Sequence, residues 1–428
     1  MKLFLKSLFN VDGKTKLNIV LDICFLTLFF ATLVSIPIFS LKTKYTSITW
    51  ILSILTFLII TIEFVFYYKI RIDIIVVSLI LFLVSAIFSS AINGFKNFVP
   101  TPLLLNVATV IIYMYLKSNK NILKATFLAA YLALMVFVAV YLLMYGKDVI
   151  TFNTERLGSL FGDQNDIALF LSLCFSISFY FVLKSKWYFK IVTILICVLS
   201  FLCGASTGSK IFIVSTTITL VTAIIVCFGK RRWYLSLIVI SGIVVSSAVL
   251  FSMPFMSNLR NRLLTFINSF FDINYQSTTG VDSSSFDRYH LLKASFMLFL
   301  TKPLFGYGIN GFQSANGFLN GWSHNNLGEL LSDFGLIGTF LFNLPIVLSL
   351  YSFFSSHKNR TSDKKIGFII LVFFISAMIS VAYTREKIYS FIIPISFTYL
   401  YDENHFFEFS LKESVINKLI LKRRVIKK

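Results

Sequence analysis

Long apolar runs follow one another along almost the whole chain, and they limit the possible fold more than any other feature of the sequence. A helix that crosses a bilayer needs about 20 consecutive, mostly apolar residues. Of the 428 residues, 57% are hydrophobic and 14% are charged, whereas ordinary soluble domains carry about 25% charged residues. The sequence therefore predicts an all-α fold, a polytopic bundle of helices that cross a membrane.

About twelve segments are apolar enough to cross a bilayer, although three of them are short and a count of ten or eleven would also fit. They divide the chain into nine spans within residues 1–252, an outer loop with short helices at 253–326, and three spans with a basic tail at 327–428. The predicted spans are 19–39, 48–68, 74–92, 103–116, 122–145, 166–183, 189–203, 211–228, 234–251, 327–354, 366–382 and 388–401.

The formal net charge of +20 comes from Lys and Arg clusters that alternate with the apolar runs. With the N-terminus inside, 26 of the 39 Lys and Arg residues fall on the inner side, as expected for cytoplasmic loops beside anionic lipids. Nucleic-acid binding would instead need basic residues gathered on one soluble surface. We therefore expect no nucleic-acid partner, a place in a bacterial cytoplasmic membrane, and both termini in the cytoplasm.

Two outer segments, 146–164 and 253–326, are long enough to carry chemistry in this topology. Within the second, apolar residues recur at helical spacing over 259–271, which fits a helix on the membrane surface or one packed over the bundle. A second helix is predicted over 286–301, with Ser284 or Ser285 as its N-cap and Pro303 beyond its end.

Gly306, Gly308 and Gly311 spell a G-x-G-x-x-G motif, and Asp333 follows about 20 residues later, as in a dinucleotide-binding fingerprint. That fingerprint requires a preceding strand in a βαβ unit, whereas this motif follows a predicted helix and Pro303 on the outer side. We therefore interpret the glycines as a tight re-entrant turn. Because no Walker loop, outer DxD motif or His/Cys cluster with ligand spacing occurs, we expect neither a metal nor a cofactor.

His324 and Asn325 stand where the outer loop enters the predicted span 327–354. A histidine partly out of water can accept a proton from a sugar hydroxyl, although an interfacial histidine with only a structural role is an alternative. Glu329 and Asp333 lie four residues apart on one face of that helix. Acids at membrane depth are usually paired or functional, and the alternative is a surface position at the interface.

Four cations fall beside span ends on the predicted outer side: Arg156, Lys210, Arg288 and Arg385. Each alone fits a lipid headgroup anchor. A guanidinium fork also matches phosphate oxygens, and a lipid diphosphate that arrives through the bilayer would be held at this depth. If the four cations converge, they indicate a diphosphate site.

Three stretches of the chain resemble the superfamily of O-antigen ligases and Wzy-type polysaccharide polymerases, which are bacterial membrane glycosyltransferases. They extend from Arg156 to Asn165, from Ser206 to Lys210, and from Arg288 to Gly338, and they occur in the order expected for this superfamily. Lys210 stands where the family usually has Arg, so the charge is kept and the bidentate fork is lost. His290 stands where Trp is common.

The resemblance implies a glycan on undecaprenyl diphosphate as the donor and a metal-independent, inverting transfer of that glycan. By motif, Arg156 and Arg288 would contact the diphosphate, Lys210 would add charge, and His324 would act as the base or orient the acceptor. From its membrane depth rather than by motif, Glu329 would hold an Arg in place or assist proton removal. The remaining expected substrate contacts are Asn165, Asn325, Gly306, Gly308 and, from its predicted depth alone, Arg385.

We predict a polymerase that joins lipid-linked repeat units of capsule, exopolysaccharide or O-antigen on the outer face, alongside a chain-length regulator and a flippase of the same pathway. A ligase that transfers glycan to lipid A core or to protein is the alternative within the superfamily. A flippase of lipid-linked sugars would also show many spans and a basic inner face, but such transporters seldom need a long outer loop.

Overall fold

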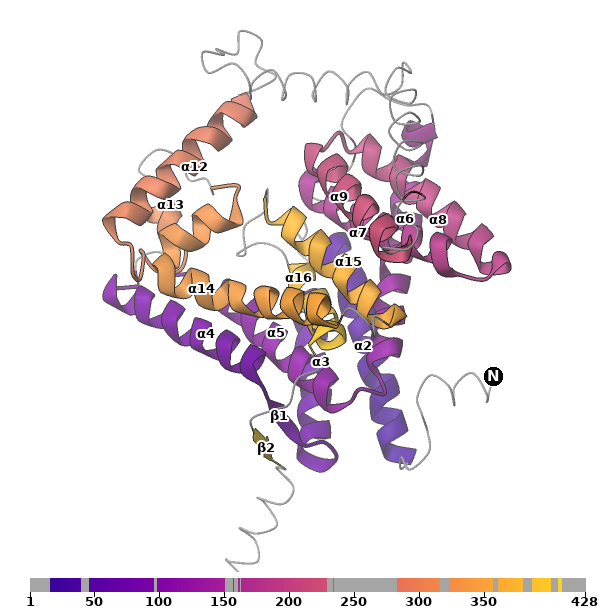
Figure 1. The fold of residues 1–428 in the computed structure, drawn as a ribbon, viewed down its shortest axis with the longest axis horizontal. Coiled ribbons are helices and arrows are strands. Elements are labelled where there is room, and N and C mark those ends of the chain that lie inside the picture. Colours follow the sequence, from indigo (N-terminus) through magenta and orange to yellow (C-terminus); the bar gives the residue numbers. More distant parts are fainter. Residues whose placement is uncertain are drawn as a thin grey trace, which may run out of the picture.

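The computed structural model describes residues 16–39, 46–95, 98–150, 157, 161, 163–228, 234, 283–315, 323–356, 361–379, 387–401 and 407–409. These residues form a helical bundle (Figure 1), which confirms the predicted all-α class. Nine of the described helices are long and apolar enough to cross a membrane, so the chain is a multi-pass membrane protein.

Eleven of the predicted spans coincide with a described helix. The predicted span 234–251, apart from residue 234, and the predicted surface helix 259–271 lie outside the described residues. The predicted helix over 286–301 is α12. The helices are α2 (Lys16–Phe39), α3 (Thr46–Phe66), α4 (Ile74–Ile92), α5 (Thr101–Ser118), α6 (Leu123–Ile150), α7 (Gln164–Lys184), α8 (Trp187–Ser206), α9 (Lys210–Phe228), α12 (Ser283–Thr301), α13 (Gly311–Ala315), α14 (Asn326–Ser355), α15 (Ser362–Ala377) and α16 (Lys387–Leu400).

Polar residues fix several helix starts, because the first N–H groups of a helix lack partners within it. Asp73 caps α4 by accepting a hydrogen bond from the N–H of Val76 at 3.1 Å. Thr361 caps α15 through the N–H of Lys364, and Asp163 caps α7 through the N–H of Asn165. The helix ends at the membrane surfaces are thereby set by local sequence.

Helices α7 and α9 run parallel and are joined by polar contacts along their length. The hydroxyl oxygens of Ser172 and Ser215 lie 3.1 Å apart, and those of Ser176 and Thr219 lie 2.6 Å apart, with the same offset of 43 residues in both pairs. All four side chains are buried, so the hydroxyls satisfy one another and the carbonyls of their own helices. The N-terminal ends of α7 and α9 therefore lie at the same end of the bundle.

Two three-residue strands, β1 (Ile70–Ile72) and β2 (Phe407–Phe409), pair antiparallel beside the start of α4 (Figure 1). The sequence did not predict them. Their pairing brings the α3–α4 connection and the segment after α16 to one end of the bundle, and Arg71 forms an ion pair with Glu408 at 3.2 Å. Both segments fall on the inner side in the predicted topology, so the pairing agrees with it.

A buried ion pair lies beside these strands. Lys117 Nζ is 3.4 Å from Asp73 Oδ2 and donates to the carbonyl of Tyr401 at 2.7 Å. Tyr113 donates to the same carboxylate oxygen at 2.6 Å. Both charged side chains are almost fully buried. The cluster ties the ends of α5 and α16 to the N-terminus of α4.

We expect Lys117→Met to lower the free energy of unfolding by about 3–5 kcal/mol, because it leaves the Asp73 carboxylate buried without its cation. Unfolding in detergent micelles measures the loss. In the double variant Lys117→Met/Asp73→Asn, most of the loss should be recovered, since the amide oxygen still accepts from Val76 and the amide NH2 group can donate to the Tyr113 hydroxyl oxygen. If the two substitutions are simply additive, the ion pair does not stabilise the fold.

Candidate functional site

Helix α14 is interrupted at Gly335, a break that the sequence did not predict. Gly335 has φ 64° and ψ −161°, a backbone conformation that only glycine adopts readily. The loop after α12 fills the break. Tyr307 and Gly308 donate to the carbonyls of Ser332 and Asp333 at 2.9 and 2.7 Å. Leu336 donates to the carbonyl of Pro303 at 2.8 Å, so the interrupted backbone keeps its hydrogen bonds.

The glycine motif makes this close approach possible, as the predicted tight turn requires. Gly306 and Gly308 have φ 65° and 90°. A Cβ on Gly306 would lie 2.4 Å from the Asp333 carbonyl carbon, and one on Gly308 would lie 2.8 Å from Ser90 Cα. Ser90 Oγ accepts the N–H of Ile309 at 2.9 Å. The motif thus holds the loop between α4 and the break in α14. Helices α4 and α14 lie side by side in Figure 1.

Asp333 is fully buried at this junction, so the interpretation as a surface acid is wrong for it. Its Oδ1 accepts the N–H of Phe312, in the first turn of α13, at 2.7 Å. The same aspartate's carbonyl accepts from Gly308. Asp333 therefore fastens the G-x-G-x-x-G segment to the first half of α14.

The N-terminus of α14 presents His324 at the rim of the bundle. Asn325 is its N-cap and accepts the N–H of Gly328 at 3.0 Å. His324, directly before the cap, is half-buried and has φ 51°, a left-handed conformation in which histidine is one of the better tolerated residues. A tight turn thus sets the direction of the imidazole.

Glu329, in the first turns of α14, contacts the residue that precedes His324. Its side chain is fully buried, so a surface position is excluded for it as well. Its Oε2 accepts the N–H of Ser323 at 3.2 Å and lies 3.0 Å from the Ser323 hydroxyl. That hydroxyl is also 2.6 Å from the carbonyl oxygen of Asn325. Glu329 and Ser323 therefore fix the backbone on both sides of His324.

The C-terminal end of α15 meets the same turn. The N–H of Asn326 donates to the carbonyl of Met378 at 3.0 Å, and Asn325 Nδ2 donates to the carbonyl of Ile379 at 3.3 Å. At its other end, α15 contacts the end of α7, where the Tyr180 hydroxyl donates to the carbonyl of Ser362. The His324 turn and the N-terminus of α7 therefore lie at the same end of the bundle.

Arg288 lies on the face of α12 that packs against α14. A Cβ on Gly328 would lie 2.5 Å from Ser295 Oγ. Further along both segments, the N–H of Leu336 donates to the carbonyl of Pro303. Helix α12 and the first half of α14 therefore run parallel and pack against each other. Arg288 is two turns before Ser295 on the same face, about 10 Å along the helix. This places Arg288, which is half-buried, at the level of the His324 turn. His290, two residues later on α12, is exposed.

The motif stretch from Ser206 to Lys210 leads into α9, whose first residue is the cation Lys210. Ser209 Oγ donates to Asn165 Oδ1 at 2.7 Å, and the N–H of Leu157 donates to the carbonyl of Ser206 at 3.1 Å. Lys210 opens α9 directly after Ser209 and is half-buried. The two motif stretches that end at Asn165 and Lys210 thus meet, although nothing in their spacing predicts it.

The structure brings most of the predicted site residues that it describes to one end of the bundle. Lys210 and Asn165 lie at the N-terminal ends of α9 and α7, and His324, Asn325 and Arg288 lie around the start of α14. Arg156 and Arg385 lie outside the described residues. Ser209 and Ser323 were not predicted, because a serine beside a motif is too common to indicate a role.

One comparison with known proteins gave a match. Residues 195–343 match the model of a protein family described as O-antigen ligase. The matched segment includes Lys210, Arg288, the glycine motif and His324. A search of curated proteins gave no match.

Proposed function

Since residues 195–343 match the model of a family described as O-antigen ligase, we propose that this chain is a membrane glycosyltransferase that polymerises repeat units carried on undecaprenyl diphosphate. The observation that supports the proposal is that Lys210, the Arg288 face of α12 and the His324 turn lie at the same end of the bundle. Two cations and a half-buried base are what a transfer from a lipid diphosphate requires.

The proposed reaction is a single displacement. An acceptor sugar hydroxyl attacks the anomeric carbon of the donor, and the bond from that carbon to the diphosphate oxygen breaks. His324 accepts the hydroxyl proton, while Lys210 and Arg288 stabilise the negative charge that develops on the departing diphosphate. The donor brings its own leaving group, so the transfer needs no nucleotide.

Glu329 acts in this proposal as a positioning residue, because its carboxylate contacts the backbone N–H and the hydroxyl of Ser323. We expect Glu329→Ala or Ser323→Ala to lower kcat by about 10- to 100-fold with little change in KM, as expected when a hydrogen bond to a charged group is lost. Glu329→Gln should retain most activity and the wild-type pH profile, since its amide oxygen still accepts from Ser323. If Glu329→Gln is as inactive as Glu329→Ala, the carboxylate itself takes the proton.

The proposed site faces the outside of the cytoplasmic membrane. The positive-inside distribution places the opposite end, which carries β1, β2 and the Lys117 ion pair, in the cytoplasm. Labelling of single cysteines from outside intact cells tests the orientation. A cysteine at Asn310 should react, whereas one at Lys120, at the inner end of α5, should not.

Polymerase and ligase are distinguished by their products. The purified protein is mixed with a lipid-diphosphate repeat unit in EDTA, without nucleotide, and the products are separated by size. We expect a ladder of increasing length, since a polymerase uses growing chain and repeat unit alike. The family description favours ligase as the second candidate, and a single transfer to a separate acceptor with no ladder would establish it.

A further inference from the structure

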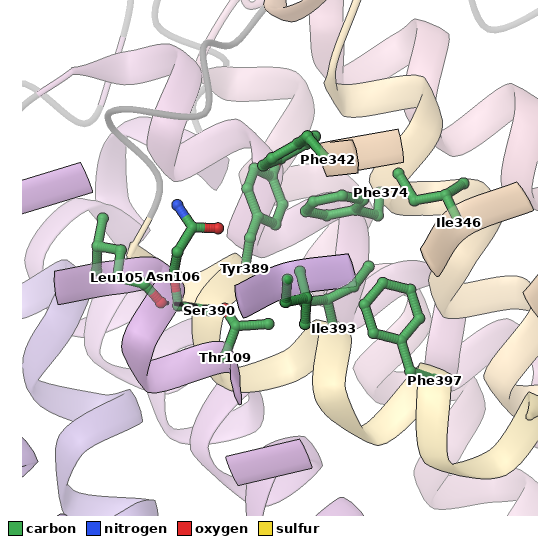
Figure 2. A pocket seen from close by; sticks show the side chains of 11 residues that line it. Leu105, Asn106, Thr109, Phe342, Ile346, Phe374, Tyr389, Ser390, Ile393 and Phe397 are labelled. Atoms are coloured by element: carbon green, nitrogen blue, oxygen red, sulfur yellow. Dashed lines mark hydrogen bonds between the residues drawn. The ribbon is translucent and has the colours of Figure 1, made fainter. Parts of the chain in front are cut away.

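Two apolar features of the described helices take no part in the mechanism proposed above. The first is a narrow pocket between α4, α5, α14, α15 and α16 (Figure 2). Its accessible space is about 40 Å³, little more than one water molecule occupies, and most of the side chains that line it are buried. The second is an exposed face of α12, a helix at the edge of the bundle (Figure 1). The pocket is too small for a ligand, whereas the face of α12 can contact a partner.

Helix α12 is buried on one side and exposed on the other. Ser295 is fully buried against α14, where its Oγ would lie 2.5 Å from a Cβ on Gly328. Phe296, Met297 and Leu300 are 42%, 59% and 68% exposed. At about 100° per residue, these three side chains share the side of the helix opposite Ser295. They form one apolar face, which α12 presents away from the bundle.

The apolar face of α12 continues the lipid-facing surface of two membrane-spanning helices. Phe88 of α4 is exposed, and Phe305, in the turn after α12, packs edge-on against it with ring centroids 5.1 Å apart. Leu304 is also exposed, and its carbonyl accepts the N–H of Ile337 at 3.3 Å, beside the exposed Leu336 of α14. Both α4 and α14 are long and apolar enough to cross the membrane, so their exposed apolar side chains contact acyl chains. The apolar face of α12 therefore adjoins hydrocarbon at its C-terminal end.

The polar groups at this end of α12 bond to one another instead of interrupting the apolar face. Lys302 Nζ donates to Asn93 Oδ1 and lies 4.3 Å from the centre of the Tyr307 ring. The hydroxyl oxygens of Thr301 and Tyr307 are 2.8 Å apart, and Asn93 Nδ2 donates to the carbonyl of Gly306 at 3.1 Å. Mutual bonding of this kind is what polar groups beside a lipid phase require. Since Asn93 is the C-cap of α4, the cluster lies on the outer side in the predicted topology.

The length and charge of α12 fit a helix that lies in the membrane interface. Its apolar part, His290–Thr301, is about 18 Å long, too short to cross a hydrocarbon core of about 30 Å. Lys293 is exposed on the same side as Leu300, about two turns earlier. A lysine there can extend its ammonium to lipid phosphates while its methylene stem covers apolar surface. An apolar face with a cation beside it is typical of interfacial helices.

We propose that α12 lies in the outer leaflet of the membrane, with the face formed by Phe296, Met297 and Leu300 against lipid acyl chains. This contact is separate from the proposed function, since lipid at this face takes no part in the transfer. It has a consequence for the site all the same. Arg288 lies about 12 Å before Phe296 on the same helix, so the lipid contact sets the level of its guanidinium relative to the bilayer phosphates.

Fluorescence quenching from the two phases tests the proposal. Single cysteines at Leu300 and Ser314 are labelled with a bimane fluorophore, and each protein is placed in lipid nanodiscs with brominated or plain acyl chains. Ser314 is the comparison site, because it is an exposed polar residue of α13. The wild type, whose five cysteines are buried or half-buried, gives the background. We expect brominated lipid to quench the Leu300 label about 2- to 3-fold more than the Ser314 label, and aqueous iodide to show the reverse order.

Two results would overturn the proposal. If iodide quenches both labels equally, α12 stands in water. If neither quencher reaches the Leu300 label, protein covers the face, and cross-linking in the nanodisc would show whether a second copy does so. Labels at Phe296 and Met297 repeat the measurement, so the test survives the loss of one variant through misfolding.

Discussion

Gly306→Ala is expected to lower the free energy of unfolding by about 3–5 kcal/mol, which is a large part of the marginal stability of most proteins. Two costs add. Alanine is strained at φ 65°, and its Cβ would lie 2.4 Å from the Asp333 carbonyl carbon. Backbone cannot move aside there, because the Asp333 carbonyl accepts the N–H of Gly308. Thermal unfolding in detergent and the yield of monodisperse protein measure the effect.

Gly94→Ala separates the two costs. Gly94 has nearly the same φ, 67°, but a Cβ there would meet no atom within 4 Å. We expect it to cost only about 1–2 kcal/mol, the price of the left-handed conformation alone. If the two variants unfold alike, the close approach of the loop to the break in α14 does not exist.

His324→Asn is expected to lower the transfer rate by about 10²- to 10⁴-fold, the usual contribution of a general base. Asparagine is chosen because it tolerates the left-handed backbone of this position, φ 51°, so the turn is kept while the imidazole is lost. Insertion and thermal unfolding should therefore match the wild type. The measurement is initial rate of glycan transfer with the lipid-diphosphate donor.

His290→Asn is the control for this variant, because His290 is an exposed histidine on α12, two residues from Arg288. It should retain near-wild-type rates. Equal rates for wild type and His324→Asn would remove His324 from the chemistry, and equal losses in both histidine variants would point to a general effect on the protein.

Hydropathy predicted the spans well because each helix must satisfy its own backbone in lipid, so its apolar length is fixed by the bilayer. The break in α14 escaped this reasoning. Residues on both sides of Gly335 are apolar, and the hydrogen bonds that make the break tolerable come from Pro303 and Gly308, far back in the sequence. Likewise, β1 and β2 are three-residue strands at opposite ends of the chain, which no local pattern can pair.

The candidate site was predictable where residue type and position relative to a span agreed, as for His324 and Lys210. The contact of Glu329 with Ser323 was not predictable, because its depth in the membrane indicated either a functional acid or a surface position and named no partner. Its burial depends on the turn formed by Ser323 and on the end of α15, which lie in other segments. These contacts between distant segments, which the sequence does not reveal, are what buries the Glu329 carboxylate against the Ser323 backbone.

The central claim is that cations at one end of the bundle hold a lipid diphosphate. The most direct test is the Kd of farnesyl diphosphate for the purified protein, compared between Lys210→Gln and Lys184→Gln. These lysines stand at opposite ends of the parallel pair α7 and α9. We predict that Lys210→Gln weakens binding by about 10- to 100-fold and Lys184→Gln does not. Equal Kd values for wild type and both variants would contradict the account.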